Sequence, residues 1–236
     1  MIELREATVA VPSADGDVTI LHPTSLSLTE PRISIIGGNG SGKSTLARLF
    51  NGLIEPSSGS VTVRAGKRGA DPQPLDTRRD GAAVRRSVGF VFTDPSAQLI
   101  MPTVIEDVSL SLRRQYRDKQ ERHAAALTAL ERFGLHHLAD NSVHSLSGGQ
   151  KQMLAITSVL ATDPAILVAD EPTTLLDLRN SRLVGDLLMS LPQQVCVVTH
   201  DLDLAARADR TLVVEGGRVV FDGAPGEAIA HYRALA

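Results

Sequence analysis

The first part of the chain alternates between hydrophobic and polar residues in short runs that are broken by turns. IELREATVAV, VTIL and SLSL show the two-residue period of strands, and PSADGD, after the first of them, has the composition of a turn. ISIIG, SGSVTVR and VGFVF also predict strands. ISIIG is compact, largely apolar and ends in glycine, which is typical of a buried parallel strand.

Helical periodicity is found in four segments. Helices are expected from Lys43 through TLARLFNGL, in EDVSLSLRR, in RHAAALTALERFGL and over 150–161, where Asp163 and Pro164 end the pattern. Beyond them, AILVAD, SRLVGDLLMS, QVCVVT and DLDLAARA alternate between strand and helix, and TLVVEGGRVVF predicts a hairpin. This alternation predicts an α/β fold with a mostly parallel sheet and helices on both faces. Residues 66–83 hold Gly, Pro and mixed charge without a period, and predict an exposed loop.

The composition narrows the class of protein. With 236 residues, 42% hydrophobic and 22% charged, the chain can bury a core without disulfides or metals. Its single cysteine, Cys196, is expected to be a buried strand residue, and the lack of any disulfide within the chain fits a reducing cytoplasm. A net charge of −3 without a basic block does not suggest a nucleic-acid partner. The N-terminus does not look like a secretion signal, and no apolar run approaches the ~18–20 residues that cross a bilayer, so a partner would have to hold this chain at a membrane.

Residues 37–44, GGNGSGKS, fit the phosphate-binding pattern G-x-x-x-x-G-K-[ST]. Glycines let the backbone curl so that successive N–H groups point at phosphate oxygens, and the helix that follows adds its positive dipole end. Lys43 is expected to reach the β- and γ-phosphates of a nucleotide, Ser44 to hold Mg²⁺, and Thr45 to lie near the α-phosphate. The predicted phosphate loop consists of Gly37, Gly38, Asn39, Gly40, Ser41, Gly42, Lys43, Ser44 and Thr45.

An acidic pair, Asp170 and Glu171, ends the predicted strand ILVAD. Ligands of parallel α/β sheets lie at the carboxyl ends of the strands. Asp170 is therefore expected to bind the Mg²⁺ shell, and Glu171 to polarise a water for in-line attack on the γ-phosphate. Taken alone, such a pair is more often a solvated strand end; the phosphate loop earlier in the chain favours the catalytic interpretation.

Two more motifs complete an ordered set. LSGGQKQ at 146–152 lies between the phosphate loop and ILVADE, and His200 follows them all in VVTHD. In this order and in these residues, essentially the whole chain resembles the ATP-binding-cassette (ABC) ATPase family. The resemblance implies ATP and Mg²⁺ as ligands. It also implies a P-loop NTPase fold with an N-terminal antiparallel β subdomain and an inserted helical lobe, as one domain over 1–236 with its core at 1–93 and 162–236 and its lobe at about 94–161.

The same resemblance implies roles for single residues. Glu171 would be the catalytic base, and His200 would contact the γ-phosphate and orient the attack. TLLD, ending at Asp177, resembles the loop that crosses the interface of a head-to-tail dimer with a second ATPase subunit. The start of the helix at LSGGQ would bind the γ-phosphate of the ATP held by that second subunit, through Ser147, Gly149 and Gln150. A homodimer and a heterodimer are both open.

Two positions depart from the family pattern. The strand VGFVF normally leads into a glutamine that touches Mg²⁺, but here Thr93 stands in that place and Asp94 follows it. The Thr93 hydroxyl could still bind a metal-bound water, or hydrolysis and coupling could be weakened; the intact phosphate and base residues favour an active enzyme. The aromatic residue that stacks on adenine is replaced by Val11, which predicts apolar contact with the base and loose discrimination between ATP and GTP.

VFTDPSAQL followed by TVIEDVSLSL resembles the ATPases of energy-coupling-factor and cobalt-type importers, and within that group those of biotin transporters. This resemblance implies a vitamin or a transition-metal ion as cargo, and two membrane partners, an integral coupling protein and a substrate-binding protein. It places the chain at the cytoplasmic face of the inner membrane as a peripheral subunit. The residues at 98–101, QLIM, either line a groove for the coupling protein or pack in the core. The alternatives are a soluble ABC ATPase acting on DNA or ribosomes, and a regulatory nucleotide-binding subunit with weak turnover.

Overall fold

The structure, a computed structural model, describes residues 1–14, 16–65 and 73–235. The chain divides into two compact units. The first unit contains residues 1–90, 165–171 and 187–236, and the second contains 91–164 and 172–186. All of the segment 94–161, predicted to form the helical lobe, belongs to the second unit, which also contains 91–93, 162–164 and 172–186 of the predicted core. In the part of the chain that is described, no helix is both long and apolar enough to cross a membrane.

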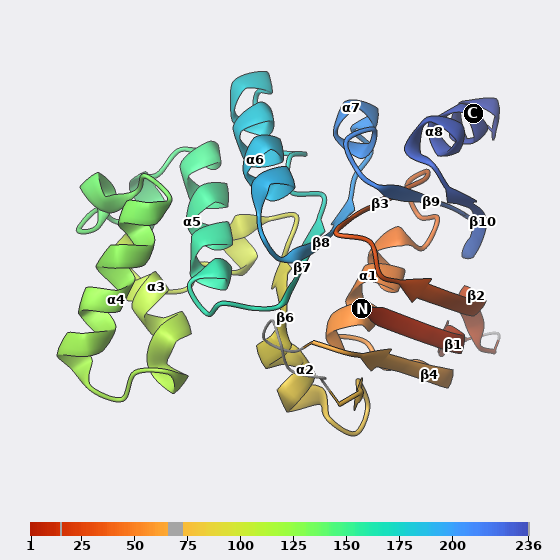
Figure 1. Cartoon of the computed structure of the whole chain (residues 1–236), viewed down its shortest axis with the longest axis horizontal. Helices are drawn as coiled ribbons and strands as arrows, with labels where there is room; N and C mark the ends of the chain where they lie inside the picture. The colour runs from red at the N-terminus through yellow and green to blue at the C-terminus, as the bar shows by residue number, and fades with distance from the viewer. Residues whose placement is uncertain (15, 66–72, 236) are drawn as a thin grey trace. The chain divides into compact units, whose positions relative to one another are not determined.

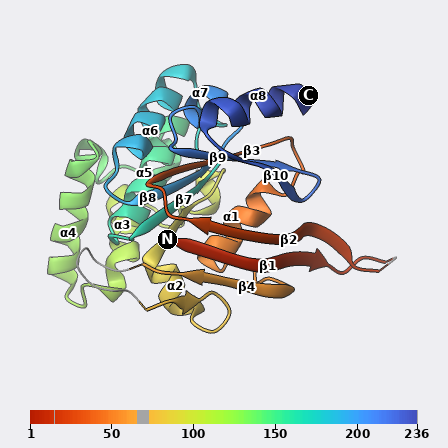
Figure 2. The same cartoon turned by 45° about the vertical axis from the view of Figure 1, so that its right-hand side comes forward.

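An antiparallel sheet opens the first unit, as predicted (Figure 2). Its spatial order is β2 (Val18–Leu28), β1 (Ile2–Val11), β4 (Ser58–Val63) and β5 (Leu75–Asp76). The two short runs VTIL and SLSL form one continuous strand, β2, which pairs along the length of β1. Every second residue at the start of β1 is buried, so the two-residue period of the sequence marks the face that packs inward.

The second sheet of this unit carries the parallel strands. Its order is β10 (Arg218–Gly223), β9 (Arg210–Glu215), β3 (Arg32–Ile36), β8 (Gln194–Val198), β7 (Ile166–Asp170) and β6 (Val88–Val91). β3 pairs in parallel with both β8 and β9, and β7 with β8, whereas β9 and β10 form the predicted antiparallel hairpin. Cys196 in β8 is fully buried, as expected, and burial raises the pKa of its thiol to about 12.

Helices cover both faces of the parallel sheet, which confirms the predicted α/β class. α1 (Lys43–Asn51) contacts β7 and β8 on one side and β2 and β4 of the antiparallel sheet on the other. α7 (Leu202–Ala205) and α8 (Pro225–Leu235) pack against β3, β9 and β10 on the face away from α1 (Figure 1). The sequence analysis did not predict α8.

The prediction of an exposed loop at 66–83 is wrong over its second half; residues 66–72 lie outside the described part of the chain. Leu75–Asp76 form β5, α2 (Gly81–Ser87) follows, and Thr77 is buried. The Asp76 carboxylate accepts hydrogen bonds from the backbone N–H groups of Arg78 and Arg79, each at 3.0 Å. Hydrogen bonds between side chains and the backbone of this kind can order a segment that has no hydrophobic period, so the period of the sequence did not indicate β5 or α2.

The second unit is helical, and its helices pack around an apolar core. They are α3 (Val104–Ser111), α4 (Lys119–Arg132) and α5 (Gly148–Leu160), with short 3-10 helices η1 (Pro95–Ala97), η2 (Leu112–Arg114), η3 (His136–Leu138) and η4 (Val143–Ser145). α6 (Leu178–Ser190) begins in this unit. Leu99 packs in its core, whereas Ile100 is 70% exposed. The core interpretation of the segment QLIM therefore holds for Leu99 and not for Ile100.

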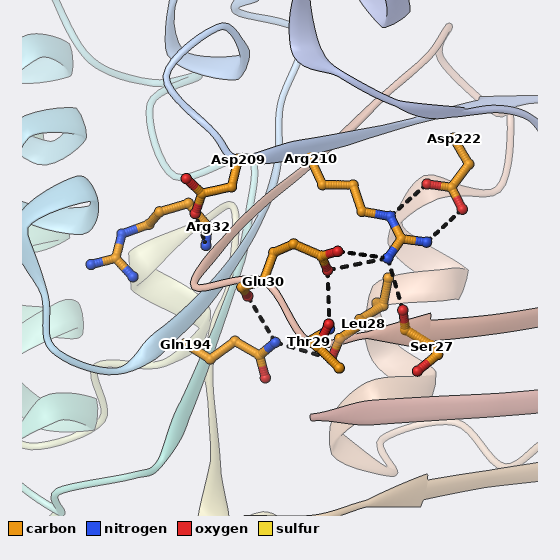
Figure 3. A network of polar contacts seen from close by, with 9 residues as sticks. All are labelled: Ser27, Leu28, Thr29, Glu30, Arg32, Gln194, Asp209, Arg210 and Asp222. Atoms are coloured by element: carbon orange, nitrogen blue, oxygen red, sulfur yellow. Dashed lines mark hydrogen bonds and ion pairs between the residues drawn. The ribbon is translucent and has the colours of Figure 1, made fainter.

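A polar network joins the two sheets of the first unit around Arg210 (Figure 3). The guanidinium of this β9 residue forms two 2.6 Å bonds to the Asp222 carboxylate on β10. Its Nη1 also donates to the Ser27 carbonyl oxygen at the end of β2 (2.8 Å) and to both carboxylate oxygens of Glu30 (3.1 Å). One half-buried arginine thus ties three segments that are far apart in the sequence.

Replacing Arg210 with alanine is expected to lower the free energy of unfolding by about 2–3 kcal/mol, because two carboxylates and a carbonyl lose a charged donor. Arg210→Lys should recover only part of this loss, since an ammonium cannot make the paired bonds to Asp222. Urea unfolding followed by circular dichroism measures both, with exposed Arg114→Ala as the control. Equal unfolding midpoints for Arg210→Ala and the control would show that the network contributes no stability.

Candidate active site

The predicted phosphate loop joins β3 to α1 and has the backbone of a tight curl. Gly37 and Gly42 have φ values of 151° and 103°, in the region that favours glycine. A Cβ atom on Gly37 would lie 2.1 Å from the carbonyl oxygen of Val214, so no larger residue fits there. The β9–β10 turn supports the loop from outside, since the Gly217 N–H donates to the Ser41 carbonyl oxygen at 2.8 Å.

Hydrogen-bond donors converge at the start of α1. Gly42, the N-cap residue, provides no side-chain cap, and the first turn contains no acidic residue. The buried Ser41 hydroxyl has no hydrogen-bond partner among the residues described. An uncapped helix start with a buried free hydroxyl beside it fits a phosphate group, which accepts hydrogen bonds and carries negative charge.

Lys43 adds a buried positive charge to the loop. Its Nζ donates to the carbonyl oxygens of Gly37 (2.8 Å) and Gly38 (2.7 Å). Burial lowers the pKa of the Lys43 ammonium, and the nearby carboxylates of Glu171, Asp170 and Glu215 act against that shift. The ammonium is therefore held by two carbonyl oxygens, which phosphate oxygens can replace.

The two residues predicted as ligands of Mg²⁺ in the first unit lie in contact. The Ser44 hydroxyl donates to Oδ1 of Asp170 at 2.8 Å, although the residues are separated by 126 positions in the sequence. Asp170, at the end of β7, is only 1% exposed. Burial raises the pKa of its carboxyl, while the Ser44 hydrogen bond and the charge of Arg48 oppose the rise. A hydroxyl and a carboxylate beside a phosphate cradle are oxygen ligands of the kind that Mg²⁺ uses.

Arg48 was not predicted. Its Nη2 lies 3.7 Å from Oδ2 of Asp170, so the carboxylate is held from two sides. Arg48 follows Ser44 by one helical turn of α1, and residues four apart lie on the same face of a helix. That spacing was the signal in the sequence from which Arg48 could have been found.

Glu171 and His200 form a pair at the ends of β7 and β8. Nδ1 of His200 lies 2.7 Å from Oε2 of Glu171, and the backbone N–H of His200 donates to the same oxygen at 3.4 Å. Glu171 has a φ of 52°, a conformation that costs a non-glycine residue on the order of 1–2 kcal/mol. Its N–H donates to the Val198 carbonyl oxygen at 2.9 Å, which helps to hold this backbone in place. The carboxylate is thus fixed by its own backbone and by an imidazole, as a positioned base would be.

The LSGGQ residues and the TLLD loop lie together in the second unit. Ser147 caps α5: its hydroxyl accepts from the Gln150 N–H at 3.3 Å, and the Gln150 side chain accepts from the Ser147 N–H at 2.9 Å. α5 begins at Gly148, two residues before the predicted start. Asp177 accepts from the Asn180 N–H at 2.8 Å, and Asn180 packs on Gly149.

The two departures from the family pattern lie in different units. Thr93 is half-buried in the second unit, just beyond β6. Gln98 holds the chain before it, because its side chain accepts from the Phe92 N–H and donates to the Ala155 carbonyl oxygen of α5, both at 3.3 Å. In the first unit, Val11 pairs across the sheet with Val18, and the two are 42% and 48% exposed. They form a small apolar surface at the end of the β1–β2 ribbon.

Comparisons with known proteins identify the family and the fold of the chain. The ABC transporter family model matches residues 21–174. The biotin transport ATP-binding protein BioM of Rhizobium etli is 45% identical over 221 residues, which cover 94% of each chain. The energy-coupling factor transporter ATP-binding protein EcfA1 of Lactiplantibacillus plantarum is 36% identical over 242 residues, covering 100% of this chain and 83% of the other. The solved dimer of the ATP-binding cassette MJ0796, in a post-hydrolysis state bound to ADP and Pi, is similar with a TM-score of 0.81 at 31% identity, over 95% of this chain and 99% of that one.

Proposed function

Since the chain belongs to the ABC transporter family of ATP-binding proteins, we propose that it is the ATP-hydrolysing subunit of an energy-coupling-factor importer. It is an ATPase that uses ATP with Mg²⁺. The observation that carries the ATP-hydrolysing part of the proposal is the contact of Ser44 with Asp170 beside the uncapped start of α1. The importer part rests on the similarity to BioM and EcfA1. The proposed cargo is a vitamin, with biotin first because of the similarity to BioM, and a transition-metal ion is the alternative.

Each site residue has a proposed role in hydrolysis. The loop from Gly37 to Thr45 binds the phosphates through backbone N–H groups, the Ser41 hydroxyl and the Lys43 ammonium. Ser44 and Asp170 would hold Mg²⁺, which when bound neutralises charge on the phosphate oxygens. Glu171 takes the proton of the attacking water. His200, whose Nδ1 lies 2.7 Å from the Glu171 carboxylate, orients this base and contacts the γ-phosphate.

We propose that two ATPase subunits act together. ABC cassettes form dimers, as the MJ0796 structure shows for that protein. In the proposed head-to-tail dimer, Ser147, Gly149 and Gln150 of one subunit contact the γ-phosphate bound by the other. Asp177 lies at the interface, and Thr93 contributes to the Mg²⁺ shell. A coupling protein and a substrate-binding protein in the membrane would hold the pair at the cytoplasmic face of the inner membrane.

Affinity purification of the full chain from detergent-solubilised membranes tests this assembly. The expected result is co-purification of two integral membrane proteins that retain a small-molecule vitamin or a metal ion, identified by mass spectrometry. Recovery of ribosomes or DNA in their place would contradict the importer.

The Val11–Val18 surface leads to a prediction about base recognition. Because no aromatic ring stands at position 11, ATP and GTP should bind with similar affinity. Val11→Tyr should strengthen ATP binding by about fivefold, from ~1 kcal/mol of stacking between the new ring and the base. Titration with fluorescent ATP and GTP analogues measures both effects. Leu53→Tyr, at another exposed apolar position of the same unit, serves as the control. A strong preference of the unaltered protein for ATP would rule out this account.

A further inference from the structure

Asn180 covers the second glycine of the LSGGQ motif. A Cβ atom on Gly149 would lie 2.5 Å from Cγ of Asn180, and 2.7 Å and 2.8 Å from its Oδ1 and Nδ2. The carboxamide of Asn180 on α6 therefore fills the space that a side chain at 149, in the first turn of α5, would occupy. Any side chain at 149 would have to displace this amide.

The same amide holds the carboxylate of Asp177. Oδ1 of Asp177 accepts from the backbone N–H of Asn180 at 2.8 Å, and Oδ2 accepts from its side-chain Nδ2 at 3.0 Å. Capping of α6 by Asp177 needs only the backbone N–H, which every non-proline residue at 180 would supply. The second hydrogen bond and the packing on Gly149 need the asparagine side chain itself.

We propose that Asn180 is a positioning residue that fixes the distance between Gly149 and Asp177. This role rests on the proposed function, in which both residues face the ATP of a second subunit. Held by one planar amide, the start of α5 and the TLLD loop reach that ATP as a single rigid surface. Loss of the amide leaves ATP binding to each separate subunit intact, because the phosphate loop belongs to the first unit and Asn180 to the second.

Asn180→Ala and Asn180→Asp test the role in the full chain that carries Glu171→Gln, in which ATP binds without turnover. Both variants keep the backbone cap. Asn180→Ala is expected to weaken ATP-driven dimerisation by about tenfold, from the loss of one charge-assisted hydrogen bond and its packing. Asn180→Asp should weaken it more, because its carboxylate faces that of Asp177, and added salt should reduce the difference. Binding of a fluorescent ATP analogue to the separate subunit should stay within about twofold of the parent protein.

Light scattering at a series of protein concentrations gives the dimer dissociation constant, and Arg179→Ala, an exposed neighbour on α6, is the control. Dimerisation of Asn180→Asp equal to that of the parent would overturn the positioning role and leave the proposed function standing. If Asn180→Ala and Asn180→Asp both lost ATP binding to the separate subunit and thermal stability to the same extent as dimerisation, the positioning role would be overturned as well. Such losses would indicate that Asn180 is needed only for folding. If the parent with Glu171→Gln formed no ATP-dependent dimer at all, the proposed dimer would fail and this role with it.

Discussion

Glu171→Gln is expected to reduce the rate of ATP hydrolysis by about 10²- to 10⁴-fold while ATP binding remains. Glutamine has nearly the same shape, so it keeps the backbone conformation at φ 52° and can still contact His200. It cannot accept the proton of the attacking water, and the fully bound state before hydrolysis should therefore accumulate. A stable ATP-bound dimer is the second expected sign of this change.

Steady-state release of phosphate measures the rate, and size-exclusion chromatography with ATP and Mg²⁺ detects the dimer. Glu227→Gln in α8 is the matched control, because this glutamate is exposed and α8 contributes no residue to the predicted site. The control should hydrolyse ATP at the unaltered rate. Turnover by Glu171→Gln within a few fold of the parent would mean that another group takes the proton.

Lys43→Ala is expected to weaken ATP binding by on the order of 100-fold, since at least two charge-assisted hydrogen bonds to phosphate are lost. The structure adds a second reason. Lys43 is the buried cation among the carboxylates of Glu171, Asp170 and Glu215, and without it their charges would repel the phosphates. Lys43→Arg should rescue little, because the wider guanidinium does not fit the buried site between the Gly37 and Gly38 carbonyls.

Equilibrium titration with a fluorescent ATP analogue, in the absence of Mg²⁺, separates this effect from metal binding. Lys119→Ala, which removes an exposed lysine at the start of α4, is the control and should bind like the parent protein. Circular dichroism should show the same helix content for all three variants. Unchanged affinity of Lys43→Ala would remove this residue from the phosphate site.

Much of the fold could be predicted because its signals are local. The period of β1, the apolar run of β3 and the glycine-rich turn before α1 each depend on residues next to one another in the chain. β5 and α2 escaped prediction because the segment has no hydrophobic period, and hydrogen bonds from backbone N–H groups to the side chains of Asp76 and Asp80 order the turn between them. α8 escaped because only two of its residues, Ala228 and Ile229, are buried.

For the site, the sequence by itself predicted the phosphate loop, because its chemistry depends on adjacent positions. The acidic pair, His200 and the LSGGQ residues were predicted from the order of the motifs and the family resemblance that this order carries. Only the tertiary structure decided which of them meet. Ser44 reaches Asp170 across 126 residues, and His200 reaches Glu171 across 29, because α1 begins at the edge of the sheet where the parallel strands β7 and β8 end. Arg48 and Asn180 belong to no motif, and they gain their roles from what they touch.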